Sequence, residues 1–163
     1  MANSVYNPRN LKLSWLGFTA KDLGADTAIS VTRNEDIIDY ESGIDGSVKI
    51  SKLPDHTGEL TLSCQMGGAT HAFLSGIIAG QDAAGKTLIG DMVFNDPSGD
   101  AFFLAKGATL MTGPEYTYGP TATGETRDYV FLISDLTIVA DPFGATDAID
   151  PAITSAVSTA FTF

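Results

Sequence analysis

The sequence predicts a single domain that is mainly β, with antiparallel strands joined by many turns and with one helix. Short segments alternate apolar and polar side chains, which is the period of a strand with one buried face. The 17 glycines and 7 prolines are scattered among 163 residues, as in turn-rich β proteins. Because 44% of the residues are hydrophobic, the chain can build the core of one compact domain.

Three strands are expected in the first 40 residues. The first covers residues 11–15, where apolar and polar side chains alternate until Gly17 interrupts the pattern. The second is centred on residues 29–31, and the third, at residues 37–40, follows the polar corner Arg33–Asp36. These strands are short, so their glycine and polar breaks predict tight connections.

Residues 31–51 predict a hairpin that projects from the body of the domain. Its turn, Gly43–Gly46, contains an Asp-Gly pair, and glycine readily adopts the positive φ that a tight hairpin turn needs. The chain then returns through Val48 and Ile50. We interpret the segment as rich in charges and poor in large apolar side chains, so little would hold it against a core.

The clearest strand and the one convincing helix lie between residues 58 and 80. Apolar residues at every second position, from Leu60 to Met66, predict a strand with one buried face. After Gly67 and Gly68 the apolar spacing becomes helical, and we expect Thr70 to cap the helix and Gly80 to end it. The apolar side chains of this helix are Phe73, Leu74, Ile77 and Ile78.

A second hairpin is predicted from residues 88–94 and 101–111. The turn-forming residues 95–100 separate its two strands, and a further turn-rich loop covers residues 113–124. Residues 80–87 before this hairpin are expected to form a loop.

The longest predicted strand runs from Arg127 to Ala140. Its middle, Val130–Ile133, is apolar at every position, so we expect a central strand that is covered on both faces. The alternation weakens at Ser134 and Asp135, which suggests a β-bulge.

The composition changes after Asp141 to alanine, threonine, serine and aspartate with few large apolar side chains. Such a segment is too thinly apolar to fold alone, so we interpret it as an arm that docks on this domain or on a neighbour. We therefore divide the chain into a domain of residues 1–140 and a C-terminal arm of residues 141–163.

The charge and the single cysteine restrict the possible environments and partners. A formal net charge of −11 disfavours a surface that grips nucleic acid or an anionic membrane. No apolar run approaches the roughly 20 residues of a membrane span, so we expect neither an anchor nor a secretory signal. Cys64 alone excludes an internal disulfide, as expected of a protein made in a reducing cytoplasm.

One segment matches the nucleotide-binding pattern G-x-x-x-x-G-K-[ST] at every fixed position. The matching residues are Gly80, Gly85, Lys86 and Thr87. In a functional P-loop a strand leads in and a helix leads out, so that backbone N–H groups face the phosphates. Here a helix leads in and a strand leads out. We therefore expect no nucleotide and no other cofactor at this segment.

The other reactive residue types form no recognisable catalytic or metal-binding pattern. His56 and His71 lie far apart and lack zinc-ligand spacing, and Cys64 falls on the apolar side of its strand. Asp96 and Asp100 flank a turn without the spacing of a calcium loop. The sequence therefore predicts no catalytic residues, no metal and no enzyme activity.

Several short motifs in this order resemble the tail tube proteins of contractile-tailed bacteriophages. They are Tyr6–Pro8, Arg33–Asp36, Gly43–Gly46, Asp55–Leu62 and Gly124–Phe131. The resemblance extends from about Tyr6 to Ala140. It implies an antiparallel β-sandwich or barrel with one flanking helix, whose subunits form hexameric rings that stack into a hollow tube inside a sheath.

The resemblance also implies partners and a location. The partners would be other copies of the chain, the sheath protein, a tape measure protein in the lumen, and the baseplate and terminator proteins, with no membrane contact. Phage DNA would pass through the tube without specific binding, and the protein would belong to the virion after assembly in the host cytoplasm. A tube from a related injection system without a genome is the alternative, and a monomeric binding module or small enzyme is a third possibility.

In such a stacked-ring assembly, the hairpin and the C-terminal arm are expected to contact neighbouring subunits. The candidate contact residues are Glu35, Asp36, Ile44, Asp45, Phe143, Ile153, Phe161 and Phe163. Carboxylates on the lumen side of an acidic ring would repel phosphates, so DNA could slide without binding.

Overall fold

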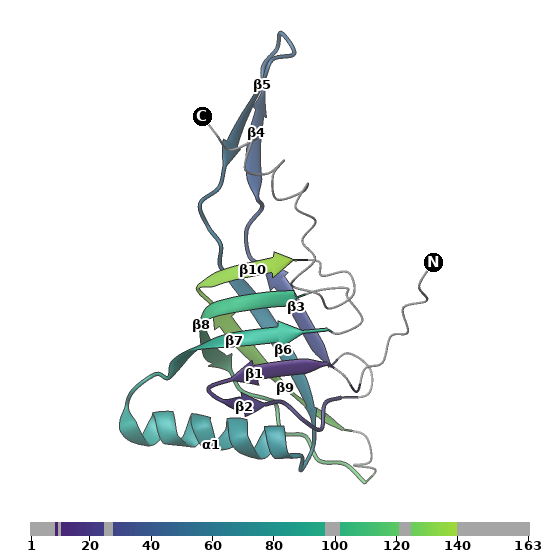
Figure 1. Ribbon diagram of the computed structural model, residues 1–163. Helices are drawn as coiled ribbons and strands as arrows, with labels where there is room; N and C mark the ends of the chain where they lie inside the picture. Colours follow the sequence, from purple (N-terminus) through teal and green to yellow (C-terminus); the bar gives the residue numbers. More distant parts are fainter. Residues whose placement is uncertain (1–8, 10, 25–27, 97–101, 121–124, 140–163) are drawn as a thin grey trace.

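The computed structural model describes residues 9, 11–24, 28–96, 102–120 and 125–139, which form ten strands and one helix (Figure 1). The strands are β1 (Lys12–Trp15), β2 (Phe18–Thr19), β3 (Ile29–Arg33), β4 (Ile38–Ser42), β5 (Val48–Lys52), β6 (Gly58–Gln65), β7 (Ile89–Asn95), β8 (Phe102–Thr112), β9 (Thr126–Ile133) and β10 (Asp135–Val139). The helix α1 (Ala69–Ala84) connects β6 to β7. The prediction of a mainly β protein with one helix is confirmed.

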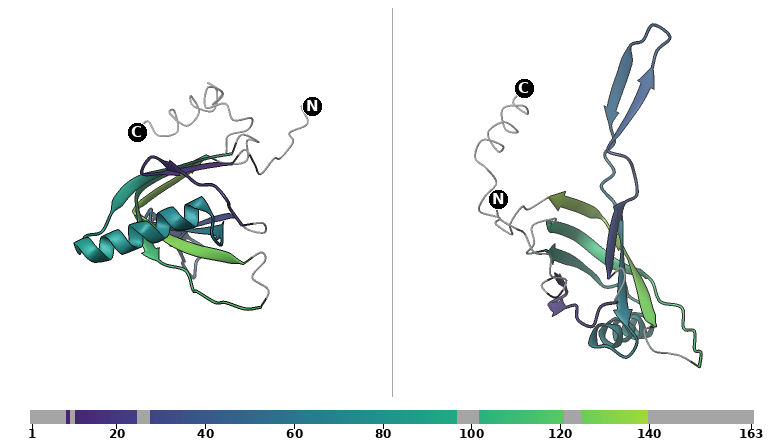
Figure 2. Two further views of the ribbon diagram at one scale, coloured as in Figure 1. Left: turned by 90° about the horizontal axis from the view of Figure 1, so that it is seen from below. Right: turned by 90° about the vertical axis from the view of Figure 1, so that its right-hand side faces the viewer.

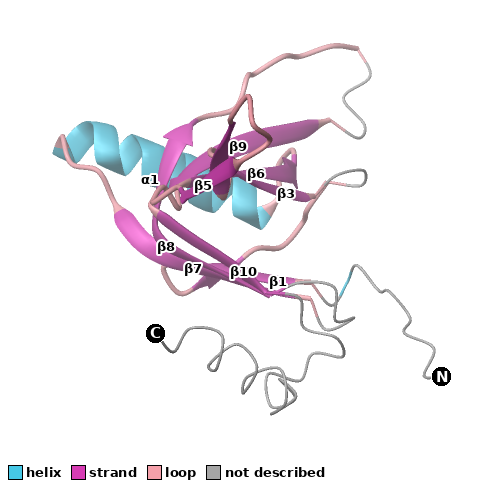
Figure 3. Cartoon of the chain, turned by 90° about the horizontal axis from the view of Figure 1, so that it is seen from above, coloured by secondary structure: helices cyan, strands magenta, loops and turns pink. Residues whose placement is uncertain are grey.

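Eight strands form one bent antiparallel sheet in the order β2-β1-β7-β8-β9-β6-β3, with β10 paired to β8. Strand β8 belongs to both halves of this sheet, because residues 102–106 pair with β10 and residues 109–112 pair with β9. The sheet therefore folds over itself into two layers, which Figure 3 shows from above. The remaining strands, β4 and β5, pair only with each other among the described residues.

The core fills the space between the two layers. Trp15 of β1 meets Phe131 of β9 edge to face, with ring centroids 5.0 Å apart. Phe94 and Phe103 stack within one layer at 4.7 Å. Full burial of such a side chain stabilises the fold by about 1.5–3 kcal/mol. The strict in-out alternation of β6 follows from this arrangement, since Leu60 and every second residue after it face the core.

Helix α1 covers one end of the sandwich, as Figure 1 and the left view of Figure 2 show. Leu74 of the helix is buried. Phe73, also of the helix, stacks on Phe18 of β2 with ring centroids 4.2 Å apart. No helix in the described part of the chain is long and apolar enough to span a membrane.

The start of α1 differs from the predicted one. Gly68 occupies the N-cap position, and Thr70 lies in the first turn with only 1% of its surface exposed. The Thr70 hydroxyl accepts a hydrogen bond from the Lys21 amide at 2.7 Å and donates to the Lys21 carbonyl. Asp22 instead accepts from the Ala69 amide at 3.0 Å. The predicted cap residue therefore ties the helix to the segment after β2.

The end of α1 is also later than predicted. The helix continues through Gly80 and ends at Gly85, whose φ of 64° is left-handed and whose amide bonds to the Gln81 carbonyl at 2.9 Å. A glycine inside a helix costs only about 1 kcal/mol relative to alanine, so Gly80 does not stop it. The prediction of a loop at residues 80–87 was therefore wrong for residues 80–84, which belong to α1.

The two predicted hairpins are confirmed. Strands β4 and β5 form a ribbon that projects from the body, as Figure 1 and the right view of Figure 2 show. Strands β7 and β8 pair along most of their length, and residues 97–101 between them lie outside the described residues.

The predicted strand from Arg127 to Ala140 is instead two strands. The chain turns at Ser134, so that β9 pairs with β6 while β10 crosses to pair with β8. The central position of β9, between β8 and β6, is confirmed. The prediction that this strand is covered on both faces was wrong, because Phe131 and Ile133 are buried whereas Leu132 is 39% exposed. The division at residue 141 stays a prediction, since residues 140–163 lie outside the described ones.

Candidate assembly surfaces

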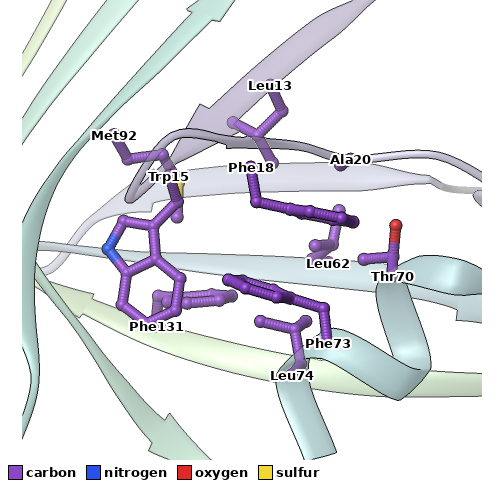
Figure 4. Close-up of a pocket in the computed structure, with 10 residues that line it drawn as sticks. All are labelled: Leu13, Trp15, Phe18, Ala20, Leu62, Thr70, Phe73, Leu74, Met92 and Phe131. Carbon is purple, nitrogen blue, oxygen red and sulfur yellow. The ribbon is translucent and has the colours of Figure 1, made fainter. Parts of the chain in front are cut away.

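A small cavity of about 20 Å³ lies between α1 and the two sheet layers (Figure 4). Its lining is almost wholly apolar, and includes Trp15, Phe73 and Phe131. The Thr70 hydroxyl at its margin already bonds to Lys21. A space of this size holds about one water molecule, so it is a packing gap and not a site for a substrate.

The segment with the P-loop pattern forms the end of a helix. Gly80 lies inside α1, Gly85 ends it, and β7 begins at Ile89, just beyond Lys86 and Thr87. The amides of Gly85 and Lys86 both point back to the Gln81 carbonyl, at 2.9 and 3.3 Å. A helix C-terminus carries partial negative charge, which repels phosphate. The segment therefore presents the wrong end of a helix for binding a nucleotide.

The histidines and the cysteine have local structural partners. The Nδ1 atom of His71 lies 2.7 Å from the Tyr129 hydroxyl, and Nδ1 of His56 lies 3.5 Å from an Asp135 carboxylate oxygen. Burial raises the pKa of the Cys64 thiol to about 11, which keeps it protonated at neutral pH. Within the described ranges no three histidine, cysteine or acidic residues are grouped to hold a metal.

The projecting hairpin gathers its apolar side chains on one face, with Lys52 beside Ile38 on that face, and carries a charged pair on the other. Tyr40 pairs with Ile50, and Ile38 and Val48 lie on the same side of the ribbon. We call these four residues the ribbon face. Their exposed fractions are 47% for Ile38, 68% for Tyr40, 57% for Val48 and 65% for Ile50. The opposite side carries the pair Glu41 and Lys49.

The ribbon face corrects the interpretation that this hairpin has few large apolar side chains. The strand pairing gathers them on one side, where nothing in the described part of the chain covers them. Two-stranded ribbons are marginally stable alone in water, and contiguous exposed apolar side chains mark contact sites.

The tip and the base of the hairpin contain the predicted contact residues. Ile44 is fully exposed at the tip, while Asp45 shapes the turn by accepting bonds from the Ser47 hydroxyl at 2.6 Å and the Ser47 amide at 3.1 Å. These bonds lower the pKa of Asp45. Glu35 and Asp36 are exposed in the connection from β3 to β4. Phe143, Ile153, Phe161 and Phe163 lie outside the described residues.

A second surface is the outer side of β3, β6 and β9, which we call the polar sheet face. Its polar members include Ser30, Thr32, Glu59, Thr61, Ser63 and Asp128, and the register places Val130 and the partly exposed Leu132 of β9 on the same side. The Ser63 hydroxyl donates to the Asp128 carboxylate at 2.5 Å. The outward-facing positions of these three strands hold two carboxylates and no lysine or arginine.

The sheet also has open margins among the described residues. Strand β3 pairs only with β6, and β10 pairs only with β8. The unpaired backbone groups of an edge strand are a template for pairing with another chain. These margins are therefore candidate contacts between subunits.

Sequence reasoning did not find the buried Arg127, which holds the loop of residues 113–120 against the body. Its guanidinium donates to the carbonyls of Glu115 and Thr117 at 3.3 and 3.2 Å. It also lies over the rings of Tyr116 and Tyr118, 5.2 and 5.5 Å from their centroids. The alternation in β9 could have revealed its burial, because Arg127 lies two and four positions before the inward-facing Tyr129 and Phe131 and so faces the same side of the strand.

No protein-family model matches this sequence, and no curated protein matches it either. Solved structures do match. The cap that terminates the tube of the anti-feeding prophage aligns with 86% of this chain and 94% of its own, at 10% identity and a TM-score of 0.54.

Two chains from the extracellular contractile injection system PVC are similar as well. One, from the extended sheath-tube complex, aligns with 83% of this chain and 92% of its own, at 8% identity and a TM-score of 0.57. The other, from the sheath/tube terminator, aligns with 86% of this chain and 100% of its own, at 9% identity and a TM-score of 0.57. The chain thus shares its fold with tube-type proteins of contractile injection systems, so the resemblance seen in the sequence is confirmed at the level of the fold.

Proposed function

We propose that this protein is a structural subunit of a contractile tail, and that hexameric rings of it stack into the inner tube. The observation that carries the proposal is the ribbon face, an exposed apolar surface on a projecting hairpin of a tube-type fold. A monomer leaves this surface in water, whereas a stacked ring covers it with the next copy. In this assembly the partners are other copies, the sheath protein, the baseplate and the terminator.

The open margins at β3 and β10 suit the contacts within a ring. Pairing of edge strands between neighbours closes a cyclic assembly and removes exposed backbone groups. The ribbon face then makes the contacts between rings, while the margins at β3 and β10 make those within a ring.

The polar sheet face suits the wall of the channel. Its polar side chains outnumber the apolar Val130 and Leu132, and Glu59 and Asp128 supply negative charge without a balancing cation on the same face. Such a wall repels the phosphates of nucleic acid. In a phage tail the tube would hold a tape measure protein before ejection, conduct DNA without binding it and belong to the virion, assembled in the host cytoplasm.

A second candidate function is the cap that ends the tube. Two of the similar structures are tube-terminating proteins, and their alignments cover at least as much of this chain as that of the sheath-tube chain. A cap forms one ring and does not propagate. A tube from a system without a genome would use the same contacts as a phage tube, with a different cargo.

The test replaces two cross-strand pairs of the ribbon, one on each face. The variant Tyr40→Ser/Ile50→Ser removes the apolar pair, and the control Glu41→Ser/Lys49→Ser removes the charged pair with no change in net charge. Electron microscopy of the purified proteins should show tubes for the parent and the control, and unstacked rings for the apolar variant. Thermal unfolding should be nearly unchanged, since the ribbon lies outside the core.

Three results would count against this account. Unchanged tubes in Tyr40→Ser/Ile50→Ser would remove the ribbon face from the stacking contact. Single rings from the parent protein would favour the cap. A parent that stays monomeric at every concentration would contradict self-assembly.

A further inference from the structure

The outer side of β7, β8 and β10 carries apolar residues that the core does not use. Phe94 and Phe103 face inward, so their strand neighbours Val93, Phe102 and Leu104 face outward. The register places Val139 of β10 beside Phe102, and Leu104 beside Val93. We call Val93, Phe102, Leu104 and Val139 the outer patch.

The outer patch is continuous and is separate from the core. Paired strands lie about 4.8 Å apart, so these side chains are direct neighbours. Val93 is 38% exposed and Val139 is 44% exposed. Phe102 and Leu104 are partly buried, yet they are not among the partly buried residues that pack on the core.

We propose that residues 141–163 of the same chain dock on the outer patch. Strand β10 ends at Val139, which is itself a member of the patch, so the following residues begin at its border. The segment contains six large apolar side chains, Phe143, Ile149, Ile153, Val157, Phe161 and Phe163. A short covalent tether gives a segment a local concentration in the millimolar range, which favours the same chain over a neighbour.

The charges of the two partners are complementary. The segment carries Asp141, Asp147 and Asp150 and has no lysine or arginine. Lys12 of β1 pairs with Asn95 of β7, and Asn95 pairs in turn with Phe102 of β8. Lys12 and Phe102 are therefore two strand spacings apart, or about 10 Å. Lys106 of β8 faces Asp135 of β10 in the register, so that border of the patch carries both signs of charge. Lys12 thus flanks the patch on one side, where it would attract the acidic segment.

The test is limited chymotrypsin digestion of the full-length protein at high dilution, with mass spectrometry of cleavage after Phe143. The parent should be cleaved slowly, whereas Val93→Asp should be cleaved at least about tenfold faster, because a charge in the patch opens the docked segment. Ile89→Asp adds the same charge to an exposed position of the same strand and should leave the rate unchanged.

A second variant changes the segment and leaves the domain intact. Phe161→Ser should also speed cleavage after Phe143, and Thr162→Ser is its control. Fast cleavage of the parent, or equal rates in the parent and both test variants, would overturn the proposal. Protection that disappears on dilution would overturn docking within the same chain. Since the measurement uses dilute protein, its result does not depend on ring formation.

Discussion

At the residue scale, Arg127 shows how a charge can organise an exposed loop from a buried position. Only 2% of its surface is accessible, and its charge is balanced by Glu125 at 3.7 Å and by two backbone carbonyls. A buried guanidinium without such partners would cost several kcal/mol. Its position over the rings of Tyr116 and Tyr118 allows cation–π attraction, for which arginine is used more often than lysine.

Replacement of Arg127 by methionine should therefore lower the free energy of unfolding by about 2–4 kcal/mol. The loop carbonyls of Glu115 and Thr117 lose their donors, and Glu125 loses its ion pair. Urea denaturation measures the loss. Lys49→Met is the control, since Lys49 is exposed, and its effect should stay within about 0.5 kcal/mol. A loss of equal size in both variants would contradict the assigned role of Arg127.

At the element scale, helix α1 explains the match to the P-loop pattern. Its sequence conforms to the pattern because a helix that ends in glycine is followed by lysine and threonine. The two glycines of the pattern have different backbone conformations, as Gly80 is helical and Gly85 has a φ of 64°. Alanine substitution at each glycine should therefore have a different effect on stability.

We predict opposite effects for Gly80→Ala and Gly85→Ala. At Gly80 a new Cβ would meet no atom within 4 Å, so alanine should stabilise the protein by about 0.5–1 kcal/mol. At Gly85 alanine is strained by the left-handed backbone and should destabilise it by about 1 kcal/mol. Thermal unfolding gives both values. Loss of stability in Gly80→Ala would show that this glycine is needed for some other reason.

The elements were predictable from the sequence where local patterns decide, and not where partners decide. The alternation in β6 and the Asp-Gly turn of the hairpin are local, and both predictions are confirmed. The break at Ser134 depends on the pairing of β10 with β8. The late end of α1 is a local exception, because a single glycine disfavours a helix only weakly. Thr70 failed as a cap because Lys21, distant in sequence, uses its hydroxyl.

The same division applies to the candidate assembly surfaces. The projection of the hairpin was predicted correctly, although its large apolar side chains were underestimated, and its apolar face requires the register of Tyr40 with Ile50. The polar sheet face likewise depends on which strands become neighbours, because Glu59 and Asp128 lie on separate strands that pair only in the fold. Contacts of the residues in the C-terminal arm, Phe143 among them, stay predictions.

At the scale of the whole molecule, the chain separates a packed body from the proposed assembly surfaces. Among the described residues, the buried aromatic and aliphatic side chains belong to the sandwich and α1, and the ribbon contributes none of them. In the proposed assembly the body would fold first, and the ribbon and the sheet margins would then make the contacts between copies. With a net charge of −11, such an assembly needs apolar contacts to offset the repulsion between subunits.

Cryo-electron microscopy of the purified full-length protein under assembly conditions tests the central claim most directly. The account predicts six-fold rings stacked into a tube, with the polar sheet face toward the channel and the ribbon face against the next ring. A monomer under all conditions, or a ring whose channel is lined by another face with the ribbon left in solvent, would contradict it.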